Sequence, residues 1–318
     1  MFNFGITGCG RITERIYLEA IRKIDGAKIV AAADPLIERQ NIVSTKVPDC
    51  QLFNSLTDML NNCQIDGLII ASPAKYHITD MLNAIQNNVP VLVEKPLALN
   101  SKQLHKINGL TEKEKQLVMI GFNRRFWDPV INLKNKVTTD KISGKYRIIT
   151  NYLSWDPISE QLDPLDDLMH HQIDITRFIS KKEIKKIEIL EKDKNIVNII
   201  LEDGSLFKLI SDHSNMYNED LMVKINDKEH LIKSSSDRVL PSYGKIRSFY
   251  DTIEKYSRLL KKQKSSFNLS YTRELMNFMI NSRTKQIMSP GIEDGIIPVK
   301  IVEAIRKSSY NGEEINIQ

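Results

Sequence analysis

The chain has few of the features that mark secreted, membrane-spanning or metal-stapled proteins. Its 318 residues include only three cysteines, Cys9, Cys50 and Cys63, and this odd number lacks the paired spacing of a zinc site. So few cysteines fit a reduced, cytoplasmic compartment best. The longest apolar runs, such as residues 67–72, fall far short of the ~18–20 residues that a membrane span requires. The first residues lack the basic segment and hydrophobic stretch of a signal peptide.

Strong charge bias, internal repeats and low-complexity segments are also absent. Lys and Arg number 45 against 40 Asp and Glu, which gives a net charge of +5, and 41% of the residues are hydrophobic. This composition is ordinary for a globular protein and excludes disordered, collagen-like and disulfide-stapled classes. The densest basic clusters, residues 181–186 and 258–264, are interpreted as solvated faces rather than as a nucleic-acid surface. At roughly 100–200 residues per domain, the length predicts two domains or one large one.

The first third of the chain alternates short apolar runs with segments of helical spacing. Strands are predicted at residues 2–7, 28–33, 67–71, 89–93 and 116–121, and helices at 12–24, 77–86 and 101–110. Such alternation is typical of βαβ units, which build a parallel sheet. Near-continuous apolar strands indicate that helices cover both faces of this sheet. The sequence therefore predicts a doubly wound α/β domain for dinucleotide binding over residues 1–122.

The pattern changes after about residue 123. Strands are predicted at residues 146–155, 184–190, 196–201, 206–211, 221–225 and 229–233, with a helix at 165–179 and a helical tail from about 244 that ends at 299–308. Turn signals such as Asp203-Gly204 and Asn226-Asp227 separate the strands, which predicts hairpins. We therefore expect residues 123–318 to form an α+β domain with an open, mainly antiparallel sheet.

A pair of glycines and an aspartate stand where a dinucleotide site requires them. Gly8 and Gly10 follow the first strand, where glycine permits a tight turn and lets the backbone approach a pyrophosphate at a helix N-terminus. The third position of this fingerprint is Thr13, and a bare Gly-x-Gly also occurs in many other turns. Asp34 ends the second strand, where a carboxylate accepts hydrogen bonds from the adenosine ribose and repels a 2′-phosphate, so NAD is favoured over NADP. The alternative is a turn-forming aspartate before Pro35.

Two further loops follow predicted strands. Ser72-Pro73 comes after the strand at 67–71, and such a loop borders the ligand crevice of a doubly wound sheet. His77 begins the next helix and either caps and packs that helix or contacts the cofactor. Lys95 follows the strand at 89–93, and a lysine there can polarise a carbonyl or share a proton with a hydroxyl. The alternative for Lys95 is an ordinary surface lysine.

The helix predicted at 165–179 carries a second candidate group. Asp167 and His171 are four residues apart, which places both side chains on one face of a helix. His171 can act as a general base near neutral pH, with a carboxylate to orient its ring, although the pair also fits a plain helix surface. Asp166 and His170 are expected off this face. No third convergent ligand is evident, so no metal is predicted.

Asn123, Arg124 and Arg125 follow the strand at 116–121, at the predicted domain boundary. Arginines there can hold carboxylate, phosphate or hydroxyl groups of a substrate. The alternative is a salt bridge between the domains.

Together, these segments resemble the glucose–fructose oxidoreductase / inositol dehydrogenase / MocA (Gfo/Idh/MocA) family of nicotinamide-dependent oxidoreductases, over nearly the whole chain. The resemblance is carried by residues 5–12 (GITGCGRI), 34–35 (DP), 72–73 (SP) with His77, 94–98 (EKPLA), 121–126 (GFNRRF), 167–174 (DLMHHQID) and 304–309 (AIRKSS). The most specific segment is the Glu-Lys-Pro signature. Thr13 and Met169 depart from the small residues that the family often has there.

The resemblance implies a Rossmann domain and an α/β domain whose open sheet joins subunits in a homodimer or homotetramer. It implies a catalytic set of Lys95, Asp167 and His171. In such a site His171 removes the hydroxyl proton, Lys95 hydrogen-bonds the same oxygen, and Asp167 binds a neighbouring hydroxyl or orients His171. The cofactor-binding residues implied are Gly8, Cys9, Gly10, Arg11, Ile12, Asp34, Ser72, Pro73, His77, Glu94 and Lys95. The substrate-binding residues implied are Asn123, Arg124, Lys95, Asp167 and His171.

The expected function is that of a cytoplasmic NAD(P)-dependent dehydrogenase, with NAD preferred. Its substrate would be a secondary alcohol or ketone of a sugar, cyclitol or nucleotide-sugar derivative, and neither nucleic acid nor membrane is an expected partner. Residues 151–167 are expected to line the substrate pocket, but they carry no pattern that identifies the sugar. Two alternatives stay open: a redox-neutral enzyme of the same family with tightly held NAD, and a non-catalytic nucleotide-binding sensor.

Overall fold

The computed structural model describes residues 1–138, 141–150, 163–213, 218–233, 266–308 and 312–317. Contacts between residues divide the chain into two compact units. The first unit consists of Met1–Asn123 and Tyr271–Glu303, and the second of Arg124–Ser270 and Ala304–Gln318. Among the described residues, no helix combines the length and the apolar character that crossing a membrane demands.

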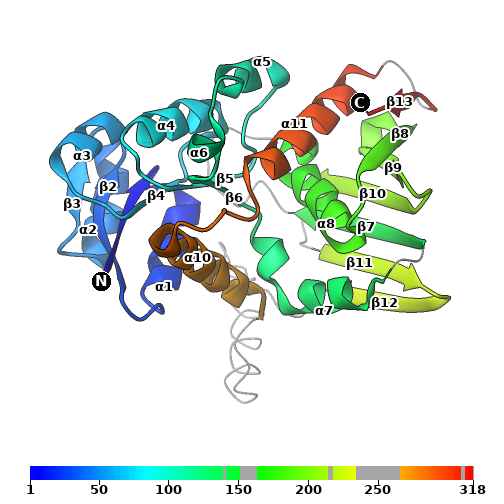
Figure 1. Cartoon of the computed structure of the whole chain (residues 1–318), viewed down its shortest axis with the longest axis horizontal. Helices are drawn as coiled ribbons and strands as arrows, with labels where there is room; N and C mark the ends of the chain where they lie inside the picture. The colour runs from blue at the N-terminus through cyan, green and yellow to red at the C-terminus, as the bar shows by residue number, and fades with distance from the viewer. Residues whose placement is uncertain (139–140, 151–162, 214–217, 234–265, 309–311, 318) are drawn as a thin grey trace, which may run out of the picture. The chain divides into compact units, whose positions relative to one another are not determined.

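The first unit is built on a parallel sheet of six strands in the order β3-β2-β1-β4-β5-β6 (Figure 1). Its strands are β1 (Phe2–Thr7), β2 (Ala27–Ala33), β3 (Gln51–Phe53), β4 (Gly67–Ile70), β5 (Val91–Glu94) and β6 (Val118–Gly121). The order turns from β1 outward in both directions, which confirms the predicted doubly wound topology. The loops after β1 and β4 therefore meet where ligands bind in such sheets.

Helices cover both faces of this sheet. The helical elements are η1 (Thr13–Tyr17), α1 (Leu18–Ile21), α2 (Ile37–Lys46), α3 (Leu56–Asn62), α4 (Ala74–Gln86), α5 (Ser101–Leu104), η2 (His105–Ile107), α6 (Glu112–Lys115), α10 (Ser266–Thr284) and α11 (Ile292–Lys307). On one face, buried strand residues such as Leu68 and Val93 pack with α3, α4, η2 and the start of α11. On the other, Phe278 of α10 packs against Phe2 and Phe4, with ring centroids 6.4 and 6.2 Å apart.

This packing explains why two late helices belong to the first unit, whereas the sequence placed everything after residue 122 in a second domain. A Cβ added to Gly67 would lie only 2.7 Å from the Phe278 ring, so α10 fits closely against β4. On the opposite face, a Cβ on Gly295 of α11 would lie 3.0 Å from Ile120. These helices bury apolar strand faces that the helices of the first 122 residues leave uncovered.

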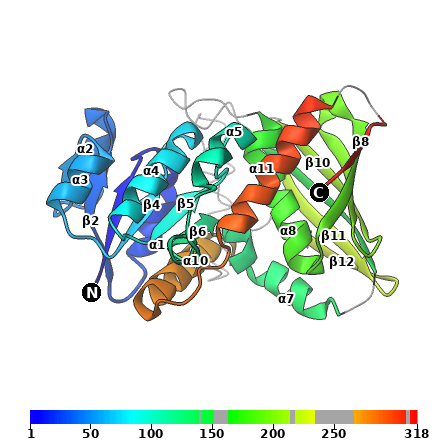
Figure 2. The same cartoon turned by 45° about the horizontal axis from the view of Figure 1, so that its top comes forward.

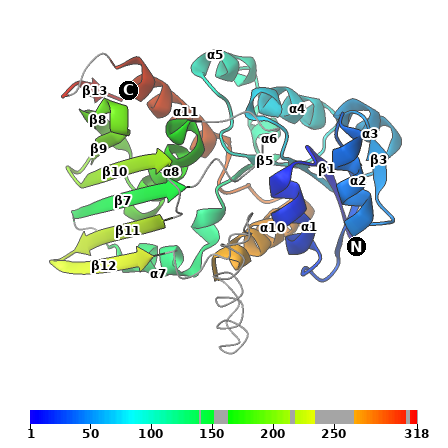
Figure 3. The same ribbon diagram turned by 180° about the vertical axis from the view of Figure 1, so that it is seen from behind.

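The second unit contains an open sheet of seven strands in the order β12-β11-β7-β10-β9-β8-β13 (Figure 3). Its strands are β7 (Ile142–Thr150), β8 (Ile184–Glu191), β9 (Ile196–Leu201), β10 (Leu206–His213), β11 (Asn218–Ile225), β12 (Lys228–Lys233) and β13 (Glu314–Asn316). Among the pairs of described strands in this sheet, only β7–β10 is parallel, so the prediction of a mainly antiparallel sheet is confirmed. The other elements in the described part of this unit are η3 (Asn123–Phe126), α7 (Asp128–Lys136), η5 (Leu165–Met169), α8 (His170–Ser180) and η6 (Lys192–Lys194).

Helix α8 lies on one face of this sheet (Figure 2). The Gln172 side chain fixes the helix there, because its Nε2 donates to the carbonyl oxygens of Tyr146 on β7 and Ile210 on β10, at 2.7 and 2.9 Å. Most strand residues on the α8 side are buried, and those on the other side are partly buried or exposed. This alternation is what a sheet with one open face produces.

Several sequence expectations are changed in detail. The sequence did not predict β3, α2, α3 or β13, whose short polar segments give no clear apolar period. The first predicted helix opens as the π-helix η1, and the second-domain helix opens as the π-helix η5. The last part of the strand predicted at 146–155, residues 151–162 of the segment expected to line the substrate pocket (151–167), and the tail at 244–265 lie outside the described residues.

Candidate active site

The glycine loop after β1 packs directly against the end of β4. Gly8 has a φ of +87°, and a Cβ there would lie 2.4 Å from the backbone C and O of Ala71 and the N of Ser72. Gly10 is less constrained, because its Cβ would meet only the Nη1 of Arg39, at 3.2 Å. Gly8 is therefore required by the fold, whereas Gly10 leaves the backbone open to an approaching group. An open backbone at the start of a helix is what a pyrophosphate needs.

Thr13 fills the third fingerprint position without disturbing this loop. Its fully buried side chain donates from Oγ1 to the carbonyl oxygen of Gly8, at 2.6 Å. The hydroxyl thus gives this backbone carbonyl a hydrogen-bond donor. Arg11 and Ile12 connect the loop to η1, and the Glu14 amide donates to the carbonyl of Gly10 at 3.0 Å. The unusual residue stabilises the turn from inside.

Asp34 is tied to the same loop. Its Oδ2 accepts from the Cys9 amide at 2.8 Å and its Oδ1 from the Leu36 amide at 2.9 Å, and the residue is only 5% exposed. A carboxylate offers about four acceptor positions, so capacity for ribose hydroxyls remains. The predicted turn-forming role and the predicted cofactor role are therefore compatible. Burial, and then the Asp34 and Cys50 charges, raise the pKa of the Cys9 thiol to about 12, so Cys9 is a neutral packing group.

His77 bridges two loops at this edge of the sheet. Its Nε2 lies 2.7 Å from the carbonyl oxygen of Ser72, and its Nδ1 lies 2.8 Å from that of Pro96. Burial lowers the pKa of His77, the two carbonyl contacts oppose this, and Lys95 lowers it further. The buried ring is thus engaged at both nitrogens, and the contacts are those of the packing interpretation. Pro73 is exposed at the start of α4.

Glu94 ends β5 in the same unit, and Lys95 directly follows it. Glu94 Oε1 accepts from the hydroxyl of the fully buried Tyr17, at 2.6 Å, and its Oε2 accepts from the Lys95 amide at 3.2 Å. The Lys95–Pro96 peptide is cis. Both oxygens of Glu94 therefore hold structure in place. The sequence did not reveal Tyr17, because it lies 77 residues from its partner.

In the second unit, Asp167 lies in η5 and His171 lies on α8, where it is 5% exposed. Asp167 faces His213, at the end of β10, with 4.0 Å between Nε2 and Oδ2. Both side chains are about a quarter exposed. The sequence did not indicate a role for His213, since it belongs to no motif and stands only at the end of a strand. Asp166, which was expected off the face of Asp167 and His171, accepts from Arg306 at 2.8 Å.

Arg124 is held by a buried carboxylate of its own unit. Its Nε and Nη2 donate to Glu219 at 2.7 and 3.1 Å, with side-chain exposures of 5% and 1%. Arg125 forms a similar fork with Asp174. These are the ion pairs of the alternative interpretation, although each lies within the second unit and not between domains. The substrate role of Asn123, which is 1% exposed, and of Arg124 stays a prediction.

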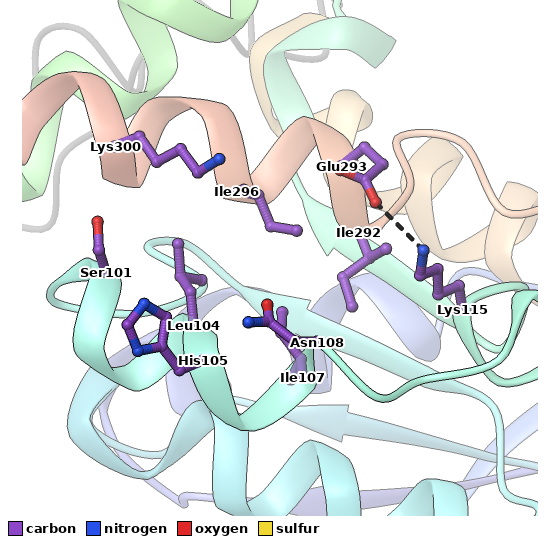
Figure 4. A pocket seen from close by; sticks show the side chains of 10 residues that line it. All are labelled: Ser101, Leu104, His105, Ile107, Asn108, Lys115, Ile292, Glu293, Ile296 and Lys300. Atoms are coloured by element: carbon purple, nitrogen blue, oxygen red, sulfur yellow. Dashed lines mark ion pairs between the residues drawn. The ribbon is translucent and has the colours of Figure 1, made fainter. Parts of the chain in front are cut away.

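The first unit contains a pocket of about 400 Å³ (Figure 4). Its floor is apolar, with Leu104 and Ile107 facing Ile296 of α11, and Lys115 and Glu293 form an ion pair at its rim, 3.6 Å apart. None of the predicted site residues lines it. Among the described residues, no group of three or more His, Cys, Asp and Glu is arranged to hold a metal ion.

Comparison with known proteins points to the same nucleotide chemistry. A family model described as "Oxidoreductase family, NAD-binding Rossmann fold" matches residues 2–122. A curated relative, inositol 2-dehydrogenase 4 of Saccharopolyspora erythraea, is 27% identical over 190 residues, which are 58% of this chain and 56% of the relative. The matches to the first curated relatives thus span about half of their length.

Solved structures share the fold of the whole chain. The myo-inositol 2-dehydrogenase of Lactobacillus plantarum superposes with a TM-score of 0.81 at 19% identity, covering 100% of this chain and 99% of that one. The scyllo-inositol dehydrogenase of Lactobacillus casei, solved with NAD(H) and scyllo-inositol, gives 0.79 at 18% identity and 99% coverage of both chains. Residues 2–122, which hold the glycine loop and Asp34, are thus similar to the NAD-binding Rossmann domain of the Gfo/Idh/MocA oxidoreductases.

Proposed function

We propose that this protein is an NAD-dependent dehydrogenase that oxidises a secondary alcohol of a cyclitol or related sugar, or reduces the matching ketone. One observation carries the proposal: the glycine loop packs against the end of β4 at Gly8 and is hydrogen-bonded to Asp34, directly after β2. Lys95 directly follows β5 of the same sheet, so all these groups lie at the carboxyl ends of its strands. A cofactor cradle and a lysine at that edge suit hydride transfer next to a hydroxyl. The inositol dehydrogenases among the relatives make cyclitols the first substrates to test.

Each of the site residues has a separate role in the proposed reaction. The backbone at Gly8 and Gly10 binds the pyrophosphate, and Asp34 accepts hydrogen bonds from the adenosine ribose. NAD, when bound, supplies the hydride acceptor. His171 takes the hydroxyl proton, and Lys95 hydrogen-bonds the same oxygen. Asp167 binds a neighbouring hydroxyl or orients His171.

Titration with NADH and NADPH, followed by absorbance assays with cyclitols, sugars and nucleotide sugars, tests this proposal. NADH binding with turnover of one substrate class supports it. Lys95→Met and His171→Ala are expected to lower kcat by about 10²–10⁴-fold, the range of general acid–base contributions. Lys102→Met and His105→Ala, at exposed positions on α5 and η2, are matched controls that keep the wild-type rate. If neither nucleotide binds, the proposal is wrong.

The open face of the second sheet is proposed to join copies of the chain. Leu206 and Leu231 are 41% and 56% exposed, large fractions for leucines in strands. Leu231 is paired with Met222, whose partner on β7 is Lys145, so these residues share the face opposite Tyr146 and α8. Light scattering after gel filtration is expected to show a dimer or tetramer. Leu231→Lys should shift it toward the monomer, and a wild-type monomer would contradict the proposal.

A further inference from the structure

Tyr17 is a buried tyrosine at the end of η1, one turn beyond the dinucleotide loop. Its hydroxyl donates to Glu94 Oε1 at 2.6 Å, and Glu94 directly precedes Lys95. We infer that Tyr17 is a positioning residue that holds Glu94, and through Glu94 the backbone of Lys95, in register with the dinucleotide loop. The catalytic consequence rests on the proposed function, whereas the positioning itself does not.

The contacts form a continuous path through the first unit. Thr13 Oγ1 donates to the carbonyl oxygen of Gly8 at 2.6 Å, which fixes the start of η1 to the loop. Tyr17 ends the same five-residue π-helix and reaches across to β5. Glu94 then accepts from the Lys95 amide through its other oxygen, at 3.2 Å. The two ends of this path are the groups that must be aligned with each other if a nicotinamide is to lie beside Lys95.

Glu94 has little freedom to move away from this arrangement. A Cβ added to Gly121 on the neighbouring strand β6 would lie 3.2 Å from the Cα of Glu94 and 3.2 Å from its Oε2. The glycine therefore leaves just enough room for the carboxylate. With β6 on one side and Tyr17 on the other, the carboxylate is confined to the position in which it meets the Lys95 amide.

The surroundings of Tyr17 keep its hydroxyl a donor. Burial raises the pKa of Tyr17 well above its ordinary value, and the charges of Glu94 and Glu274 raise it further. Glu274 is fully buried on α10, and Tyr271 of the same helix packs edge-on against the Tyr17 ring, with centroids 6.3 Å apart. The phenol thus stays protonated, and its proton serves to bind the Glu94 carboxylate.

The ring and the hydroxyl of Tyr17 do separable work, and this allows a sharp test. Tyr17→Phe keeps the ring that packs against Tyr271 and removes only the hydroxyl bond. Tyr76→Phe, at a 49% exposed position on α4, is the matched control for losing a phenol. Each variant is compared with wild type by hydrogen–deuterium exchange of the peptide that contains Lys95, by NADH titration, and by kcat and KM with the substrate found.

We expect Tyr17→Phe to raise the rate of amide exchange around Lys95 about tenfold and to lower kcat about tenfold. The Kd for NADH should stay within about twofold of wild type. Tenfold corresponds to ~1.4 kcal/mol, which lies within the range for leaving a buried acceptor without its donor. A Glu94→Ala variant, which removes both acceptor oxygens, tests the link from the other end. If Tyr17 acts through Glu94, adding Tyr17→Phe to Glu94→Ala changes kcat no further, since the bond between the two side chains is already absent.

Several results would overturn the inference. Wild-type exchange at Lys95 in Tyr17→Phe would mean that the hydroxyl holds nothing there. Multiplicative losses of kcat in the double variant would mean that the two residues act independently. A lowered Tm with unchanged kcat and unchanged exchange at Lys95 would assign Tyr17 to packing alone. The exchange measurement needs neither cofactor nor substrate, so it judges the positioning even if NADH binding, and with it the proposed function, fails.

Discussion

Replacing each loop glycine by alanine separates what the fold requires from what a pyrophosphate requires. At Gly8, the added methyl carbon would lie 2.4 Å from backbone atoms of Ala71 and Ser72, and the φ of +87° is one that alanine disfavours. Left-handed backbone costs a non-glycine residue roughly 1–2 kcal/mol. The clash with backbone, which cannot rotate away, adds a cost of similar size, so we expect a total of about 3 kcal/mol.

At about 2–4 °C per kcal/mol for domains of 150–250 residues, Gly8→Ala should lower Tm by roughly 6–12 °C. Gly10→Ala meets only the end of the Arg39 side chain, at 3.2 Å, so its Tm should stay within about 2 °C of wild type. The methyl at Gly10 would nevertheless stand where the pyrophosphate approaches. We therefore expect the Kd for NADH to rise at least tenfold, a loss of ~1.4 kcal/mol or more.

Differential scanning fluorimetry and NADH fluorescence titration measure the two effects on the same samples. A Gly8→Ala protein that melts with wild type would refute the close approach of the loop to β4. A Gly10→Ala protein that binds NADH as wild type does would refute the assignment of the pyrophosphate to this loop, whatever its stability.

Three further outcomes are expected. Asp34→Asn should weaken the binding of NADH and strengthen the binding of NADPH, each by about tenfold in Kd (~1.4 kcal/mol), because the charge that accepts from the ribose and repels a 2′-phosphate is lost. Titration with both nucleotides measures the two Kd values, and an unchanged ratio between them would contradict the prediction. Arg124→Leu should destabilise the protein by about 3–5 kcal/mol in urea unfolding, because Glu219 is left charged and buried; a loss below ~1 kcal/mol would refute a structural role. Burial places the pKa of His77 below its ordinary value of 6.5, so its contribution to stability is full above that pH and is lost as pH falls through the native pKa. His77→Gln should therefore show a smaller drop in Tm than wild type between about pH 7 and pH 5.

The sheet was predictable where strands are buried on both faces. The strands at β1, β2, β4, β5 and β6 are all apolar runs, and each was expected within two residues of where it lies. Helices α10 and α11 were expected as helices, but their place against the first sheet was not, because amphipathic spacing reports that a helix has a buried face and not which sheet covers it.

The site was predictable in its backbone and less so in its side-chain pairs. Loops that follow parallel strands meet at one sheet edge by topology, so Gly8, Asp34, Ser72 and Lys95 could be grouped from the sequence. The role of His77 could not be decided, because both its ring partners are backbone carbonyls, and these leave no trace in residue type.

The features of the site that could not be predicted are hydrogen bonds between residues that are distant in sequence. Asp34 binds the Cys9 amide across 25 residues, and Tyr17 binds Glu94 across 77. Thr13 looked like a defect in the fingerprint, yet its hydroxyl completes the loop by bonding Gly8. A motif records which residue is usual at each position, whereas the stability of the loop depends on the hydrogen bonds that the residue makes. A departure from the fingerprint therefore predicts a lost cofactor site only when the new residue disrupts the loop. Here Thr13 stabilises the loop instead, through its hydrogen bond to the Gly8 carbonyl.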